Sequence, residues 1–265
     1  MAKIRLDALL MRQGEFESRE KARAVIMSGV VFFGGKRVDK PGTMLPEDAV
    51  LDVRGAVIPY VSRGGLKLEK ALDAFAVSVA GRCCIDCGAS TGGFTDCLLQ
   101  RGAAKVYAVD VGYGQLDWRL RQDDRVVVLE RTNVRYLTPE VLDEAPSLAV
   151  IDVSFISLSL ILPPVYNLLT ETGEVICLIK PQFEAGREYV GKKGVVRDPA
   201  VHVRVLEQFF LDAAASGFGV TALDYSPIKG PEGNIEYLGH LQKNQLNGPN
   251  IDAETVVKAS HDMLY

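Results

Sequence analysis

Four charged residues of this 265-residue chain stand at the ends of apolar segments, where an α/β enzyme places its reactive groups. Asp152 ends the segment LAVID, Lys180 ends EVICLIK, and Glu236 opens IEYLGHL. Lys67 follows a glycine pair, Gly64–Gly65, at the start of a predicted helix. Open α/β sheets bind ligands outside the carboxyl ends of their strands, and a buried charge without a partner is costly. The pattern predicts a reactive charge cluster; the alternative is a structural lysine–aspartate pair.

A second motif predicts a seat for a nucleoside. In RCCIDCGASTGGFTDCLLQRG (82–102), a predicted strand runs through a small-residue turn into a predicted helix. Gly88 allows a sharp turn and close ligand approach, and Gly92 and Gly93 leave helix N–H groups uncovered. The spacing from Asp86 is Asp-x-Gly-x-x-x-Gly-Gly, which differs from the dinucleotide motif Gly-x-Gly-x-x-Gly. Asp110 ends the next predicted strand and can bind both hydroxyls of a ribose, so S-adenosyl-L-methionine is favoured over NAD.

The segments that must position these residues alternate in β/α order, which predicts a mostly parallel sheet with right-handed crossovers. The last two strands have no helix between them and predict an antiparallel hairpin. The predicted strands are 83–87, 105–110, 126–130, 148–152, 174–180, 218–225 and 235–241, and the predicted helices are 94–101, 114–121, 139–144, 158–169 and 199–216. The expected fold class is therefore α/β with a Rossmann-like sheet.

Residues 181–198 predict a long loop, and long loops at strand ends are usually functional or mobile. The basic side chains of this loop can contact a phosphate backbone or simply be solvated, and the sequence favours neither. They are Arg187, Lys192, Lys193 and Arg197.

The amino-terminal part predicts a separate small α+β module with a different charge. Residues 1–70 carry 13 Lys/Arg and 9 Asp/Glu, whereas residues 71–265 carry 17 and 25. The basic end is the expected polyanion contact. The predicted boundaries are 1–58 for this module, 59–66 for a linker, 67–245 for the sheet domain and 246–265 for a carboxyl-terminal tail or helix. The candidate RNA-binding residues are Arg5, Arg19, Arg23, Lys36, Arg37 and Arg63.

Two resemblances follow from these motifs. RLDALLMRQGEFESREKARAVIMSGVVFFGGKRV resembles an S4-type RNA-binding module, which begins R-L-D and ends in a hairpin with a basic tip. The order Lys67, Asp152, Lys180, Glu236 resembles the catalytic tetrad of FtsJ-like RNA 2′-O-methyltransferases. Together with DCGASTGGFTD (86–96), LIKPQFE (178–184) and GPEGNIEYL (230–238), the whole chain resembles the TlyA, or haemolysin A-like, family.

The resemblance implies S-adenosylmethionine-dependent methylation of the ribose 2′-OH of ribosomal RNA, with cytidine as the target. It implies that Gly88, Ser90, Gly93 and Asp110 hold the cofactor and that Asn133 lies near the adenine. Lys180 becomes the central residue at the 2′-OH, supported by Asp152. Lys180 can act as a general base or can orient the hydroxyl, and the sequence does not decide between the two. Neither the target nucleotide, the subunit nor the oligomeric state follows from the sequence.

Other function classes find less support. Cys83, Cys84, Cys87, Cys97 and Cys177 are an odd number and match buried cysteines of a reducing compartment, so we expect a cytoplasmic protein. Neither a bound metal nor a membrane span is expected, because lysines share the charge cluster and two prolines interrupt the uncharged stretch 153–170. The alternatives are a non-catalytic S4-domain ribosome-assembly factor and, with less support, a membrane-active haemolysin.

Overall fold

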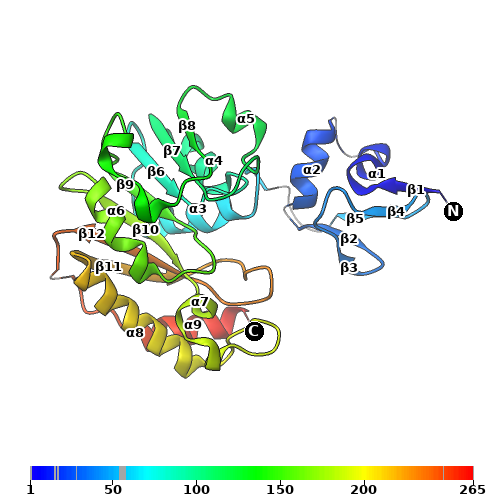
Figure 1. Ribbon diagram of the computed structural model, residues 1–265. Helices are drawn as coiled ribbons and strands as arrows, with labels where there is room; N and C mark the ends of the chain where they lie inside the picture. The colour runs from blue at the N-terminus through cyan, green and yellow to red at the C-terminus, as the bar shows by residue number, and fades with distance from the viewer. Residues whose placement is uncertain are drawn as a thin grey trace. The chain divides into compact units, whose positions relative to one another are not determined.

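The computed structural model describes residues 2–14, 16, 18–27, 29–53, 58–246 and 248–264 (Figure 1). The chain divides into two compact units, residues 1–65 and 66–265. Each unit has its own buried apolar cluster.

The first unit packs two helices against short antiparallel strands. Its apolar cluster comes from the helical repeat in the sequence, with Leu6, Leu9 and Leu10 on one helix and Val25 and Ile26 on the next. Strand β1 pairs with β4, and β2 pairs with both β3 and β5. The elements are β1 (Lys3–Arg5), α1 (Leu6–Arg12), α2 (Arg19–Met27), β2 (Val31–Phe33), β3 (Lys36–Arg37), β4 (Met44–Pro46) and β5 (Asp52–Val53).

The hairpin of this unit differs from the prediction in one detail. Lys36 and Arg37 do not lie in the turn but form β3, opposite Phe33 and Phe32. The turn itself is Gly34–Gly35, and both glycines have positive φ (55° and 76°). Two-residue hairpin turns with positive φ at both positions match the twist of the strands they join. The predicted basic tip is therefore a basic strand beside the tip.

The second unit is a seven-stranded sheet in the order β11-β12-β10-β9-β6-β7-β8. All neighbours pair in parallel except β12, which runs antiparallel to both β10 and β11. The strands are β6 (Cys83–Cys87), β7 (Lys105–Val109), β8 (Val126–Leu129), β9 (Leu148–Ile151), β10 (Glu174–Ile179), β11 (Phe218–Tyr225) and β12 (Tyr237–Lys243). The chain passes from β6 outward to β8 and returns to β9 on the other side of β6. This reversal creates a topological switch point between β6 and β9.

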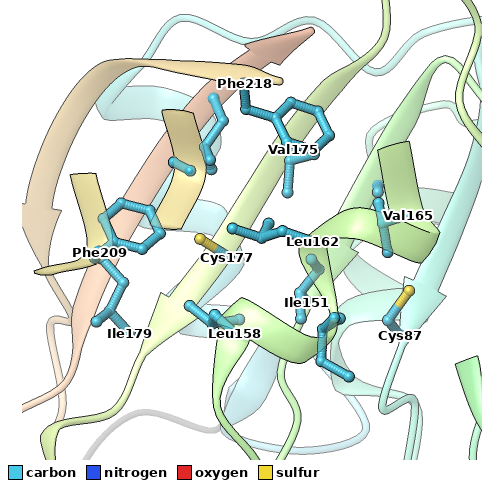
Figure 2. Close-up of a cluster of buried hydrophobic side chains, with 14 of the residues drawn as sticks. Cys87, Ile151, Leu158, Leu162, Val165, Val175, Cys177, Ile179, Phe209 and Phe218 are labelled. Atoms are coloured by element: carbon cyan, nitrogen blue, oxygen red, sulfur yellow. The ribbon is translucent and has the colours of Figure 1, made fainter. Parts of the chain in front are cut away.

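The helices of this unit are α3 (Gly64–Ala74), α4 (Gly93–Gln100), α5 (Trp118–Arg121), α6 (Leu162–Leu168), α7 (Pro181–Glu184), α8 (Pro199–Ala215) and α9 (Ala253–Leu264). The central strands β6 and β9 are buried at every position, as expected for parallel strands covered on both faces. Figure 2 shows the main core, in which Cys87, Ile151 and Cys177 on the strands pack with Leu162 of α6 and Phe209 of α8.

Several predicted elements are shorter or different in the structure. The helix expected over 114–121 spans only Trp118–Arg121, and the one expected over 139–144 is a single 3₁₀ turn, Pro139–Val141. The helix expected over 158–169 begins as a 3₁₀ turn and becomes α6. The 181–198 segment is not a plain loop, because it contains α7 and a 3₁₀ turn at Arg187–Tyr189. The predicted helices rest on the spacing of apolar residues. In these segments glycine, proline and side-chain caps determine the local geometry, so the observed elements differ from the predicted ones.

A buried polar network ties three elements of the second unit together. His202 of α8, which is fully buried, contacts the hydroxyl of Tyr237 on β12 through Nδ1 at 2.7 Å. The Tyr237 hydroxyl lies 3.1 Å from Ser260 Oγ on α9, and His261 of the same helix lies 3.2 Å from His202. Burial lowers the pKa of His202 to about 4. The network therefore requires a neutral imidazole.

We expect the stability of the second unit to fall in acid because of His202. Between pH 6.5 and 4 the unfolded chain binds a proton at this position that the folded chain excludes. The free energy of unfolding should therefore drop as pH falls, by up to about 1.4 kcal/mol per pH unit from this group alone. Urea unfolding at several pH values gives this free energy, with the fluorescence of the single tryptophan, Trp118, as the signal. In His202→Gln the slope should be smaller; parallel pH curves for the two proteins would contradict this.

Candidate active site

A hollow of about 540 Å³ lies at the switch point, beyond the carboxyl ends of β6, β7 and β9. The segments that follow these three strands, together with the segment that follows β8, form its wall. The residues around it are Gly88, Ser90, Val109, Asp110, Val111, Gln115, Thr132, Asn133, Val134, Asp152, Val153, Ser154, Phe155, Ile156 and Ile161. The volume is in the range of small-molecule and cofactor sites.

The turn after β6 has a geometry that only glycine supports at its first position. Gly88 has φ +90°, and a Cβ placed there would lie 2.7 Å from the carbonyl oxygen of Asp152. The N–H groups of Gly88 and Ala89 both donate to Val109 O, at 2.9 and 3.1 Å. This glycine therefore lets the β6 and β9 turns approach each other at the edge of the hollow.

Asp110 joins two walls of the hollow. Its carboxylate accepts the N–H of Ser90 (2.7 Å) and the N–H of Gly112 (2.6 Å). Its own carbonyl accepts the N–H of Thr132. Asn133 follows and caps a 3₁₀ turn through the N–H of Arg135 (3.0 Å). A carboxylate fixed by two backbone donors is well placed to accept further hydroxyl hydrogen bonds.

The predicted cofactor residues separate into two groups. Gly88, Ser90, Asp110 and Asn133 line the hollow. Asp86, Gly92 and Gly93 are not part of its wall. Asp86 is fully buried beneath the turn, where Thr95 Oγ1 donates to its Oδ2 at 2.6 Å and burial raises its pKa to about 7. In this position the Asp86 carboxylate supports the turn from below.

Gly92 and Gly93 also serve packing. A Cβ at Gly92 would lie 2.2 Å from a methyl of Leu120 and 2.9 Å from a methyl of Leu116. Gly93 begins α4 and is buried. Both glycines let α4 begin close to the turn that borders the hollow.

The four tetrad candidates form two ion pairs, in which Asp152 is the one partner that is not buried. Lys180 Nζ lies 2.5 Å from Asp152 Oδ1, and Lys67 Nζ lies 2.5 Å from Glu236 Oε2. Lys180 also donates to Val153 O at 2.8 Å and to Ser154 Oγ at 3.2 Å. Lys67, Lys180 and Glu236 are each exposed by less than a tenth of their surface.

The strand register brings these two pairs together. In the antiparallel ladder of β10 and β12, Ile179 pairs with Tyr237. The next pair along the same register would be Lys180 and Glu236, which flank these residues. The parallel ladders align Ile151 with Cys87 and with Cys177, so Asp152 leaves the sheet at the same edge. All four charges therefore lie at the carboxyl edge that borders the hollow.

Two further residues hold this arrangement and were not predicted from the sequence. Glu184 of α7 accepts the hydroxyl of Ser157 (2.6 Å) and the N–H of Leu158 (2.9 Å), and burial raises its pKa. It thereby fixes the 153–156 wall of the hollow relative to the helix that follows Lys180. Lys70 of α3 donates to Asp224 Oδ1 and Tyr225 O, which docks the helix that carries Lys67. Their helical spacing from the two tetrad lysines, four and three residues on, was the only signal available.

The arginines of the first unit are organised by one buried acid. Asp7 accepts both Arg5, with nitrogen–oxygen distances of 3.1 and 2.8 Å, and Arg19, at 3.1 Å. The hydrogen bond from Arg5 holds the pKa of Asp7 at about 2. Arg23 is exposed one turn beyond Arg19 on α2. The other predicted RNA contacts are Lys36 and Arg37, both on β3, and the half-buried Arg63.

The described residues offer neither a metal site nor a membrane-spanning helix. Among the residues that the structure describes, no group of three or more His, Cys, Asp or Glu side chains is placed to hold a metal ion. No helix in the described part of the chain is both long and apolar enough to cross a membrane.

The fold and site define a Rossmann-like methyltransferase domain that follows a small α+β module. The family model described as FtsJ-like methyltransferase matches residues 60–243, and the S4 domain model matches residues 4–51. The chain belongs to the FtsJ-like methyltransferase family and carries an amino-terminal S4 domain. This confirms the predicted fold class and enzyme class, and with them S-adenosylmethionine as the cofactor.

Relatives of known name span nearly the whole chain. The "Putative rRNA methyltransferase YqxC" of Bacillus subtilis is 57% identical over 240 residues, covering 90% of this chain and 85% of the relative. The "16S/23S rRNA (cytidine-2'-O)-methyltransferase TlyA" of Mycobacterium tuberculosis is 47% identical and covers 89% and 88%. A solved "Putative hemolysin" from Streptococcus thermophilus is 50% identical, with a TM-score of 0.80 and coverage of 99% and 97%. The predicted resemblance to TlyA proteins is confirmed.

We expect Gly88→Ala to weaken cofactor binding more than the same change at a glycine with similar backbone strain. Gly81 has φ +72°, and a Cβ placed there would meet no described atom within 4 Å, so Gly81→Ala carries only the backbone cost, about 1 kcal/mol. Gly88→Ala adds the clash with Asp152 O and should reduce the affinity for S-adenosylhomocysteine at least tenfold, on the order of 1.4 kcal/mol. Calorimetric titration of both variants measures this. Equal affinities for the two would show that the close approach at Gly88 does not shape the hollow.

Proposed function

We propose that this protein transfers a methyl group from S-adenosylmethionine to the ribose 2′-OH of a cytidine in ribosomal RNA. The observation that carries the proposal is the pair of buried lysine–carboxylate contacts beside a nucleoside-sized hollow. The names of relatives at 47% and 57% identity support the substrate, and the S4 domain supports an RNA partner.

S-adenosylmethionine, when bound, supplies an electrophilic methyl group on a sulfonium. The residues that would hold it are Gly88, Ser90, Asp110 and Asn133, which line the hollow from the β6, β7 and β8 turns. The hollow fits this group because Asp110 is a fixed acceptor for ribose hydroxyls and Gly88 leaves the backbone accessible. Ser154 and Phe155 close the side next to the lysine.

The tetrad would act mainly by positioning the hydroxyl. A ribose 2′-OH is a weak nucleophile, and a fixed geometry can supply much of the rate gain. Asp152, Val153 and Ser154 accept the three N–H donors of Lys180 and hold it in one orientation, and the 2′-oxygen would replace the longest of these contacts, the one to Ser154 Oγ at 3.2 Å. Lys67 and Glu236 neutralise each other beside it. Such a preorganised charge set needs no rearrangement during the reaction.

The S4 domain would supply RNA affinity through the α2 face and β3. Arg5 and Arg19 are held together on Asp7, which presents two guanidinium groups with restricted side-chain motion. Planar guanidinium groups bind phosphate in a bidentate manner. The ordering of these arginines by a buried acid reduces the entropy lost when RNA binds.

We expect Lys180→Ala to slow methyl transfer strongly while cofactor binding persists. Loss of a preorganised transition-state contact should lower the rate by on the order of 10²–10³-fold. Tritium transfer from labelled cofactor to ribosomal RNA gives the rate, and calorimetry with S-adenosylhomocysteine gives the affinity. Lys105→Ala, at the opposite edge of the sheet, is the control and should retain both. A Lys180→Ala protein with wild-type transfer would remove the proposed mechanism.

We expect Arg19→Ala and Arg23→Ala each to weaken RNA binding and its salt dependence. Each lost phosphate contact should lower the slope of log affinity against log salt by about 0.7–0.9. Lys21→Ala is a matched control, because residue 21 projects from a different side of α2 than residues 19 and 23. Filter binding of ribosomal RNA across salt concentrations provides the slopes. If Lys21→Ala has the same effect as the two arginine variants, the predicted α2 face is wrong.

A further inference from the structure

A tight turn in the segment after Lys180 presents two lysines to solvent. Gly194 N–H donates to Gly191 O at 2.8 Å, and Gly191 N–H donates to Val195 O at 3.1 Å. Lys192 and Lys193 are the two central residues of this turn, and both are exposed. Gly194 has φ +72°, which completes the turn at low steric cost.

The base of this turn is fixed by a buried asparagine. Asn234 Oδ1 accepts the N–H of Val196 at 2.9 Å, and its Nδ2 donates to Gly194 O at 2.8 Å. Asn234 is only 2% exposed, and Val195 and Val196 are buried beside it. His202 contacts Val196 O at 3.1 Å from the other side. A solvated loop has no need of such anchors, and a satisfied buried polar network rigidifies the backbone it binds.

The same asparagine belongs to the segment that carries Glu236. Asn234 O accepts the N–H of Gly230 at 2.9 Å. Gly230 in turn packs against the tetrad, since a Cβ there would lie 2.5 Å from Glu236 Oε1. The turn with the two lysines is thus tied by its base to the segment that surrounds one tetrad residue.

The charge of this segment is not neutralised by its surroundings. Within the described ranges, no carboxylate lies within 4 Å of the basic groups of Arg187, Lys192, Lys193 or Arg197, all of which are exposed. Two cations at the amino ends of the parallel strands have carboxylate partners instead. Lys105 pairs with Asp143, and Arg125 pairs with Asp123. Four cations without a described carboxylate partner therefore fall within eleven consecutive positions (187–197) of a region, residues 71–265, that carries 25 acidic against 17 basic residues.

We propose that this basic loop (187–197) is a second RNA-binding surface, which contacts phosphates next to the target nucleotide, and that Asn234 is the residue that positions it. The inference rests on the proposed function, because the polyanion it addresses is the RNA substrate. Phosphate contacts position a nucleic acid and carry no sequence information, which suits a surface beside an active site.

The first test removes the two lysines of the turn. Lys192→Ala/Lys193→Ala should raise the KM for ribosomal RNA about tenfold and lower the salt slope of binding by between about 1 and 2, with kcat retained. S-adenosylhomocysteine affinity should not change. The matched control is Lys105→Ala/Arg125→Ala, which removes two charges at the opposite edge. Equal effects of the two double variants, or no effect of the first, would overturn the proposal.

The second test addresses Asn234. Asn234→Ala should lower RNA affinity in the wild-type background and have little further effect when Lys192 and Lys193 are already alanine, as expected for coupled positions. Cofactor affinity and the Trp118 unfolding transition identify a variant that fails to fold. A full Asn234→Ala effect in both backgrounds would show that it does not act through the loop. Equilibrium binding tests the surface separately from transfer, so RNA binding without methylation contradicts the proposed reaction alone.

Discussion

The site depends on the antiparallel ladder between β10 and β12. This is the ladder that reverses direction in an otherwise parallel sheet, and its register is continuous from Glu174 opposite Gln242 to Ile179 opposite Tyr237. One residue further it brings Lys180 and Glu236 opposite each other at the rim. A shift of one strand by one residue would turn one of these two side chains to the other face of the sheet. The fully buried Tyr237 opposes such a shift, because its hydroxyl would lose its contacts with His202 and Ser260.

Burial explains why the four charges occur as pairs. Removal of an ammonium or carboxylate from water costs several kcal/mol, and a partner within hydrogen-bond distance compensates for part of this. Apolar residues of similar volume would be at least as stable, so stability does not account for the two lysine–carboxylate pairs. Their retention at the edge of a hollow is consistent with a chemical role. The supporting contacts of Glu184 and Lys70 would serve the same end, since they fix the walls and the helix from which the lysines project.

The sequence predicts the second unit well where burial alone determines structure. Strands such as β6 and β9 are buried throughout, and charges interrupt or end the apolar segments at the four residues that the structure places in two ion pairs. The sequence does not reveal side-chain contacts that form only when distant segments come together in the fold. Asp86 lies in the cofactor motif but points into the core toward Thr95. Glu184 falls in the predicted loop 181–198, and only the fold brings Ser157 and Leu158 to its carboxylate. The helix predicted over 139–144 does not form. Pro139 begins only a single 3₁₀ turn, Pro139–Val141.

The distribution of charge suggests which part of the chain would supply affinity for RNA and which part would align the RNA strand. The S4 domain, residues 4–51, is close to neutral with 8 Lys/Arg and 7 Asp/Glu, but Asp7 holds Arg5 and Arg19 in fixed positions, which suits contact with a polyanion. The methyltransferase domain is acidic as a whole, so RNA has little general attraction to it. An acidic surface with an uncompensated basic loop would disfavour the RNA backbone over much of its area and attract it at that loop. In such a domain a few fixed cations can govern where the strand lies, because repulsion elsewhere weakens the competing positions.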